Sequence, residues 1–302
     1  MVTGTAAIQP PPQDNSAQGI TPPRWAGAPA RLARMDRLCA LALVAVDGAL
    51  LDAGLDPRQP TFVGGETAVV FGTAYGCHAT NEEYYKTFLT DGLQSASPRL
   101  FAYTLPSSPV GEITIHYGVT GPASALAQGL TAGLDALLDG MRQIERGRCQ
   151  RSLVVAADVA TPLLGRLLED EGLTGPFFDG SAGVVVEPSA SAEARGQAPR
   201  GRVLGLASSF SSGQRATAIR EATRLACQMA GASAESVEAI YGPPVDAAAI
   251  GLNREQRDLA PSTLAAAPLH NLCHFLNHGR GRALIAIGDP EGTAAVALVE
   301  RA

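Results

Sequence analysis

The sequence predicts an internally duplicated α/β domain. Short apolar, β-branched runs, typical of strands in a sheet that is covered on both faces, alternate with longer segments whose apolar residues recur at helical spacing. This alternation occurs once before residue 189 and again after residue 202, so the two halves share a similar order of strands and helices. With 302 residues and a hydrophobic content of 46%, the chain has enough apolar surface to bury an extensive core.

Composition excludes several classes of protein. The net charge of -6 argues against a nucleic-acid or anionic-membrane surface, because phosphate binding relies on clusters of Lys and Arg. No run approaches the roughly 18 apolar residues of a membrane span. The five cysteines include no CxxC pair, so neither a zinc site nor a disulfide framework is indicated. We therefore expect a cytoplasmic protein with reduced cysteines and no bound metal.

The first half is predicted to cover residues 27–188. Residues 1–26 are rich in Pro and Gln and lack the basic and apolar regions of a leader peptide, so we expect a flexible arm there. A long helix should begin near Ala28 and continue to Leu51, before the turn "DAGLDP". Further strands are expected at 67–76, 152–158 and 182–188, and helices at 81–93 and 134–144.

The second half is predicted to cover residues 203–302. It follows a stretch of small and polar residues, 189–202, that we interpret as a linker. Strands are expected at 203–210, 237–243 and 293–300, with a helix at 216–231 and an apolar segment at 273–288.

The segment "GPASALAQGLTAGLDAL", residues 121–137, has the character of the approach to a buried nucleophile. A Gly-Pro pair and small residues lead into a helix, whose N-terminus would stabilise a negative charge. Reactive cysteines are often placed at such a position because the helix lowers their pKa. This segment contains no cysteine.

Several segments, in their order along the chain, resemble the thiolase-fold β-ketoacyl-ACP synthases from about residue 30 to residue 300. The family has a proline-led stretch, then "GxxGP", then seven residues before a cysteine at the start of a buried helix. The matching segments here are "SPRLFAYTLPSSPVGEITIHYGVTGPASALAQGLTAGLDAL", "IERGRCQRSLVVAADVATP", "NLCHFLNHGRGRALIAI" and "GTAAVALVE". The resemblance implies a five-layered αβαβα thiolase fold. Its cap loops would be shortened, since the region of the family's "GEG" loop is reduced to "FFDGSAGVVVEP".

The same resemblance assigns the family's catalytic positions. Leu130 stands where the condensing cysteine would be, and a leucine cannot form a thioester. Pro243 falls at or near the first histidine and Leu269 on the lysine, while His274 matches the second histidine. One functional residue of four does not form an active site, so we expect no condensing activity from the chain by itself.

Within the family, the pattern resembles the chain-length factors of bacterial type II polyketide synthases, which pair with an active ketosynthase. Many of them carry glutamine at the cysteine position. Here Gln128 lies two residues earlier, so no catalytic role is assigned to it. The resemblance implies a β-ketoacyl synthase heterodimer in antibiotic or other polyketide biosynthesis, in which this chain helps to enclose the acyl tunnel.

The resemblance also identifies the residues that would line that tunnel. The stretch "FAYTLPSSPVGE" matches the segment that lies at the dimer interface of ketosynthases and reaches the partner's acyl pocket. Leu105 matches the position at the end of the pocket, where a bulky side chain would shorten the product by steric exclusion. The candidate tunnel and interface residues are Tyr103, Thr104, Leu105, Pro106, Ser107, Ser108, Pro109 and Gln128.

The expected partners are a ketosynthase and an acyl carrier protein, with no nucleic acid and no membrane. No cofactor is expected to bind the chain directly. Acyl chains linked to phosphopantetheine would arrive through the carrier protein, which would dock on the ketosynthase because this chain is acidic. Two alternatives stay open: a divergent thiolase-fold acyltransferase or malonyl decarboxylase that uses His274, and a homodimeric scaffold that binds acyl carriers. The low aromatic content leans towards a polyene rather than an aromatic product.

Overall fold

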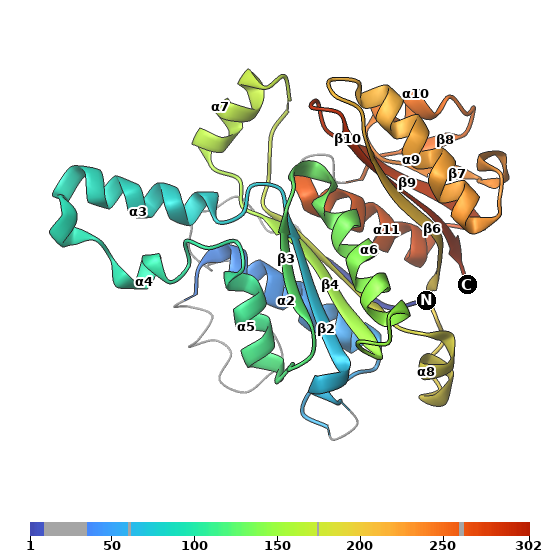
Figure 1. The fold of residues 1–302 in the computed structure, drawn as a ribbon, viewed down its shortest axis with the longest axis horizontal. Helices are drawn as coiled ribbons and strands as arrows, with labels where there is room; N and C mark the ends of the chain where they lie inside the picture. Colours follow the sequence, from blue (N-terminus) through green and yellow to red (C-terminus); the bar gives the residue numbers. More distant parts are fainter. Residues whose placement is uncertain (9–34, 60–61, 174, 260–262) are drawn as a thin grey trace.

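Ten strands form one mixed sheet in the part of the chain that the computed structural model describes, which is residues 1–8, 35–59, 62–173, 175–259 and 263–302. The strand order is β3-β2-β4-β5-β1-β6-β10-β9-β7-β8 (Figure 1). The strands are β1 (Val2–Ile8), β2 (Thr67–Thr73), β3 (Ala123–Ala127), β4 (Arg151–Asp158), β5 (Gly180–Val186), β6 (Gly201–Phe210), β7 (Ala239–Tyr241), β8 (Glu255–Arg257), β9 (Arg282–Gly288) and β10 (Thr293–Arg301).

The two halves of the sheet have the same topology. Outward from the centre, the first half runs β1, β5, β4, β2, β3 and the second runs β6, β10, β9, β7, β8. In each half the first two pairings are antiparallel and the next two are parallel. The halves meet where β1 pairs with β6 through Val2 and Gly201. The predicted internal duplication is therefore confirmed.

Helices cover and separate the two halves to give five layers. Helices α2 and α5 pack on the outer face of the first half, and α9 and α10 on the outer face of the second. Helices α6 and α11 lie between the halves and contact strands of both. The longer helices are α2 (Arg37–Asp52), α3 (His78–Asp91), α5 (Ser108–Tyr117), α6 (Ala132–Glu145), α7 (Pro162–Asp170), α9 (Arg215–Ala230), α10 (Pro244–Ile250) and α11 (Ala267–His278), and the shorter ones are α4 (Pro98–Phe101) and α8 (Ser189–Ala194).

The predicted flexible arm is wrong for its first residues, because Val2–Ile8 form the strand β1 at the centre of the sheet. The strand is nearly buried along its first half and pairs with β5 over most of its length. Its alternating Val, Thr, Ala and Ile side chains suit a pleated surface between two packed layers. The rest of the predicted arm, and the first residues of the helix expected from Ala28, lie outside the described residues.

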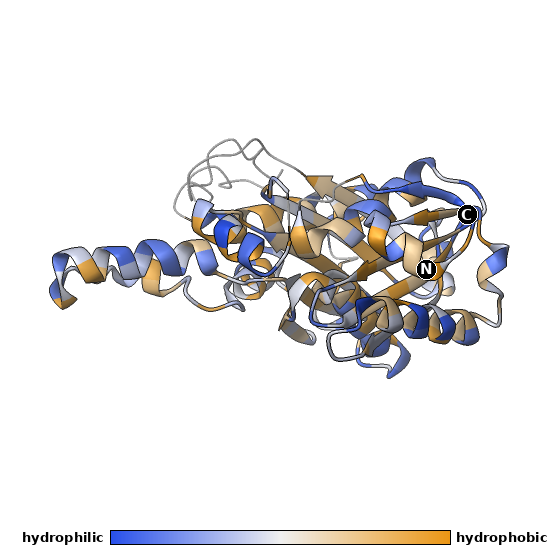
Figure 2. Ribbon diagram, turned by 90° about the horizontal axis from the view of Figure 1, so that it is seen from above, coloured by the Kyte–Doolittle hydropathy of each residue, from blue (hydrophilic) through white to orange (hydrophobic). Residues whose placement is uncertain are grey.

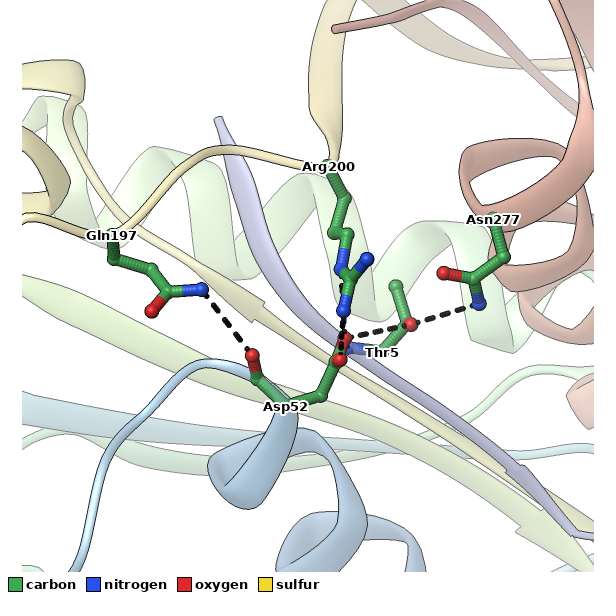
Figure 3. A network of polar contacts seen from close by, with 5 residues as sticks. All are labelled: Thr5, Asp52, Gln197, Arg200 and Asn277. Atoms are coloured by element: carbon green, nitrogen blue, oxygen red, sulfur yellow. Dashed lines mark hydrogen bonds and ion pairs between the residues drawn. The ribbon is translucent and has the colours of Figure 1, made fainter.

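A polar network fixes β1 to three other segments (Figure 3). Asp52 at the end of α2 accepts hydrogen bonds from the backbone N and the hydroxyl of Thr5, at 3.0 and 3.1 Å. It also forms an ion pair with Arg200, and Gln197 donates to its carbonyl. From α11, Asn277 donates to the hydroxyl of Thr5 at 3.1 Å. The predicted linker 189–202 is thus structured: it contains α8 and the residues that anchor β1.

Two further features bear on the predictions. All five cysteines are free and buried. None of the described helices is long and apolar enough to cross a membrane. Residues 78–101, which contain α3 and α4, project from the main body and carry both polar and apolar residues (Figures 1 and 2). We call this segment the α3–α4 arm.

Candidate functional site

The turn before α6 places Leu130 at the start of the central helix. Strand β3 ends at Ala127, and residues Gly129–Thr131 form a single 3-10 turn that leads directly into α6. Gly129 has a φ of 73°, a left-handed conformation that favours glycine. Leu130 is 7% exposed and packs in the core cluster between the two halves. The site expected for a nucleophile therefore holds a buried aliphatic side chain.

Leu130 lines a pocket of about 900 Å³. The pocket is formed by residues that follow the carboxyl ends of β2, β3 and β9, together with the end of β6. Neither cysteine nor histidine is among the described residues that line it. They are Ala74, Tyr75, Gln128, Gly129, Leu130, Thr131, Asp135, Glu171, Leu173, Ser208, Ser209, Phe210, Asp289, Pro290, Glu291 and Thr293.

The lining of this pocket is acidic. It includes four carboxylates, from Asp135, Glu171, Asp289 and Glu291, and its described part contains no lysine or arginine. Burial raises the pKa of Tyr75 to about 12, and the negative charges of Glu171, Asp158, Asp289 and Glu291 act in the same direction. Such a lining disfavours the thiolate or oxyanion that acyl transfer requires.

Asp135 and Asp289 have hydrogen-bond partners that fix the walls of the pocket. Asp135, in the first turn of α6, accepts from the hydroxyls of Ser208 and Thr131, the latter at 2.7 Å. Asp289 accepts from the backbone N of Gly292 at 3.0 Å and of Thr293 at 2.9 Å. These contacts connect α6 to β6 and close the turn between β9 and β10.

A buried carboxylate, Asp158, organises the loops around Leu130. It lies at the end of β4 and is 1% exposed. One oxygen accepts from the hydroxyl of Thr73 at 2.7 Å and from the backbone N of Ala74 at 2.9 Å, and the other accepts from the backbone N of Ala265 at 3.0 Å. Burial raises the pKa of Asp158 to about 6 in spite of these donors. The residue joins the carboxyl ends of β2 and β4 to the turn that precedes α11.

The four positions matched to the family's catalytic residues come from three segments, and Leu130 and Leu269 belong to the same core cluster. Pro243 is the N-cap of α10 on the outer layer, and Leu269 is fully buried in α11. His274 lies farther along α11, beside Tyr241 and His278, and does not line the pocket. Of the four, only Leu130 lines the pocket.

The predicted tunnel segment lies on the surface between α4 and α5. Leu105 is 62% exposed, while Pro109 is buried. Tyr103 is half-buried, and its hydroxyl donates to Glu112 at 3.1 Å, which fixes the ring against the outer layer. The loop after β2 contacts this segment, since Pro106 lies next to Gly76 and the carbonyl of Thr104 accepts a hydrogen bond from the thiol of Cys77. The hydroxyl of Ser108 donates to the carbonyl of Ala102. Ser107 occupies the N-cap position of α5, and its side chain makes no capping hydrogen bond.

Gln128 connects the pocket to a second groove of about 530 Å³ between α6 and the β6–α9 region. It lines both cavities, as do Asp135 and Ser208. The lining of the second groove includes five apolar side chains, Leu126, Leu138, Leu206, Leu225 and Met229, together with Asp139, Arg142 and Ala207. Gln128, predicted as a tunnel residue, thus stands where the two cavities meet.

Sequence reasoning missed Asp158 and the acidic residues of the pocket. A signal for Asp158 was present, because "SLVVAAD" ends in a carboxylate at the carboxyl end of a buried strand. Glu171 and Glu291 gave no comparable signal, since each sits in a polar stretch that is typical of a solvated loop.

Comparison with known proteins gives a family match and several curated relatives. Residues 13–175 match the family model for the β-ketoacyl synthase N-terminal domain. The chain is 32% identical over 249 residues to the actinorhodin polyketide putative beta-ketoacyl synthase 2 of Streptomyces coelicolor, covering 72% of this chain and 60% of that protein. It is 29% identical over 234 residues to the tetracenomycin polyketide synthase ketoacyl synthase beta subunit of Streptomyces glaucescens, covering 70% and 57%. The chain thus spans 60% and 57% of the length of these two relatives.

Solved structures share the fold over almost the whole chain. A chain of the ishigamide ketosynthase/chain length factor superposes with a TM-score of 0.80 at 22% identity, covering 99% of this chain and 98% of that one. A chain of the AntDE:AntF complex, described as a type II polyketide synthase acyl-carrier protein with its ketosynthase bound to the hexaketide, gives 0.81 at 18% identity, covering 100% and 98%. At these identities the likeness establishes the fold, which confirms the predicted thiolase-type arrangement.

Proposed function

The chain belongs to the β-ketoacyl synthase family, and we propose that it acts there as a chain-length factor: a subunit without condensing activity that pairs with an active ketosynthase. The pair would work on acyl chains that an acyl carrier protein delivers to the ketosynthase. The present chain would enclose part of the tunnel into which the polyketide grows. The observation that carries the proposal is Leu130 at the start of α6, in a pocket whose described lining has neither thiol nor imidazole.

The chemistry of the pocket supports a role without condensation. A condensing enzyme needs a thiolate for the acyl chain and donors that stabilise the carbanion and oxyanion formed on decarboxylation. Leu130 supplies neither, and the surrounding carboxylates would oppose negative charge on a bound intermediate. The same carboxylates disfavour the phosphate of a phosphopantetheine arm, so the carrier protein would deliver its cargo to the ketosynthase side.

An exposed surface of the first half, at strand β3 and residues 85–105, is suited to contact with a partner subunit. Strand β3 is an edge strand of the sheet, and its residues are largely accessible. An accessible edge strand with small side chains offers unpaired N–H and C=O groups to another chain. The α3–α4 arm and the segment that follows it expose several large apolar side chains: Tyr85, Leu89, Leu93, Phe101 and Leu105. A partner that covers this face would remove that apolar surface from water.

The names of the relatives favour the same function. Two curated relatives that match over about 70% of this chain are named as an actinorhodin polyketide putative beta-ketoacyl synthase 2 and as the beta subunit of the tetracenomycin polyketide synthase ketoacyl synthase. One structural neighbour is named as a ketosynthase/chain length factor and another as a ketosynthase with its carrier protein. By analogy with these, we propose a type II polyketide product. The low aromatic content of the chain, 5%, leans towards a polyene.

Chain-length control would follow from sterics at the interface. An exposed Leu105 next to a proline packed against Gly76 would present a fixed apolar side chain to the partner. If the growing chain reaches this side chain, further extension requires displacement of packed atoms, which costs about 1–3 kcal/mol. The ketosynthase would then release the chain in preference to another extension.

The first test is purification of this chain alone and together with the ketosynthase encoded beside it, followed by measurement of mass and stoichiometry in solution. The proposal expects a stable complex with one copy of each chain and poor solubility of the chain alone. A stable homodimer that does not bind the ketosynthase would contradict it, and would favour the homodimeric scaffold.

A further inference from the structure

Helix α11 carries three of the five histidines of the chain, each four residues from the next. His270 is buried among the strands of the first half. His274 is half-buried, and His278, in the last turn, is exposed. Residues four apart lie on one side of a helix, so the last two imidazoles project together at the end of α11.

The geometry of this pair suits chelation of one metal ion. The ring centroids of His274 and His278 are 4.8 Å apart, with planes inclined at 51°. Two imidazoles bound to one tetrahedral zinc ion, with Zn–N bonds of about 2.0–2.1 Å, place their ring centres about 5 Å apart. Small changes in the side-chain torsions would therefore direct both ring nitrogens at a common point.

The surroundings leave the two imidazoles available. No hydrogen bond or ion pair engages either ring within the described part of the chain. The basic side chain of Arg257 lies close enough to act electrostatically on His274. Arg257 would repel a cation, but its guanidinium donates to Glu255 at 2.8 and 2.6 Å, which offsets its charge.

We propose that His274 and His278 form a two-histidine site for a transition-metal ion such as Zn²⁺, with water in the remaining positions. Neutral imidazoles suit zinc, nickel and copper, whereas magnesium and calcium prefer oxygen ligands. Among the described residues no cluster of three or more metal-binding side chains occurs, so water completes the coordination. This site is separate from the pocket at Leu130 and does not depend on the proposed partnership with a ketosynthase.

Metal binding would stabilise the folded chain. The two imidazoles lie one turn apart only when α11 is helical, so an ion held by both binds the native state in preference to the unfolded chain. The last turn of α11 precedes Gly279 and leads into β9, the neighbour of β7 in the second half. We therefore expect the ion to protect the end of α11 from fraying.

The test is calorimetric titration of the purified chain, free of affinity tag, with Zn²⁺ at neutral pH. One ion per chain should bind, and the substitutions His274→Gln and His278→Gln should each weaken binding at least about tenfold. His78→Gln is the matched control, since His78 lies four residues from a possible ligand, Glu82, on another helix. That variant should bind as the wild type does, and Mg²⁺ should not bind at this site.

Two results would overturn the proposal. One is the absence of saturable Zn²⁺ binding by the wild type, and the other is unchanged affinity in both α11 variants. Circular dichroism of each variant without metal distinguishes loss of the site from loss of the fold. Both side chains are at least partly accessible, so each variant should have the spectrum of the wild type.

Discussion

Leu130 shows how one residue changes what a pocket can do. The backbone around it consists of a glycine in a left-handed turn, a single 3-10 turn and a central helix. The side chain fills the apolar space at the helix start and packs between the two halves. The position of Leu130 at the entry to a buried helix could be predicted from the sequence, and the match of Leu130 to the family's condensing cysteine stays a prediction. The acidic lining could not, because Asp135, Glu171 and Asp289 come from three separate segments.

The match of His274 to the family's second histidine stays a prediction. In the structure His274 lies on α11 beside Tyr241, and it is not among the described residues that line the pocket at Leu130. The turn before α11, which contacts Asp158 through Ala265, is the part of this segment that approaches the pocket.

Leu105 should determine product length in the reconstituted complex. We expect Leu105→Trp to shorten the main product and Leu105→Ala to lengthen it or broaden its distribution, because the exposed side chain would narrow the tunnel on the partner's side. Mass spectrometry of the released polyketides measures the change. Leu167→Trp, at an exposed leucine of α7, is the control and should leave the product unchanged. Equal product lengths in all variants would exclude this residue from the tunnel.

Asp158→Asn should loosen the loops around the pocket. The amide would retain one acceptor oxygen but present an NH₂ group to a backbone donor, such as that of Ala265, so we expect a loss of about 1–3 kcal/mol in the free energy of unfolding. Urea denaturation at several pH values measures it.

The pH dependence of that loss has a definite sign. The folded-state pKa of Asp158, about 6, lies above the ordinary value near 4, so its protonated form favours folding. That contribution is fully present below about pH 4 and is lost as the pH rises through 6. The advantage of the wild type over Asp158→Asn should therefore be greater at low pH than at neutral pH. A greater advantage at neutral pH would contradict the assigned shift.

Among the elements, those with strong apolar patterns were predictable. The sequence indicated β2, β4, β5, α6 and α9 because strands buried on both faces are continuously apolar and helices show a 3.6-residue period. Strands β1 and β3 were not predicted. Both consist largely of alanine, threonine and glycine or serine, and such residues acquire a defined role only through their neighbours in the sheet.

The close packing of α6 depends on a glycine. A Cβ added to Gly133 would lie 2.2 Å from the carbonyl oxygen of Ala265, a backbone atom that cannot rotate away. We expect Gly133→Ala to destabilise the chain by about 1–3 kcal/mol through overpacking. Gly165 in α7 has open space around its Cβ position, so Gly165→Ala should be neutral or slightly stabilising. Thermal unfolding of both variants compares them, and equal midpoints would refute the packing argument.

At the scale of the whole molecule, the duplication was predictable but the way in which the halves join was not. The repeated order of strands and helices is visible along the sequence, and the two halves of the sheet reproduce it strand for strand. The junction, however, uses β1, from residues that we expected to be flexible, and the network of Thr5, Asp52, Arg200 and Asn277. These contacts span 272 residues along the sequence, from Thr5 to Asn277, and no local pattern encodes them.

The interior and the exposed edge of the molecule have different roles in the proposed function. Apolar side chains, including Leu130, fill the interior between the two halves. By contrast, the edge strand β3 and the α3–α4 arm expose apolar surface. Association with a partner subunit would remove this apolar surface from water and so stabilise the complex. In this proposal the pocket at Leu130 takes no part in the condensation.

The most direct test of this account is intact-mass analysis of the co-purified complex after incubation with an acylated carrier protein. We predict one copy of this chain with one ketosynthase, and a single acyl adduct on the ketosynthase with none on this chain. An acyl adduct on this chain, or a complex that contains this chain alone, would contradict the claim that it is a partner subunit without condensing activity.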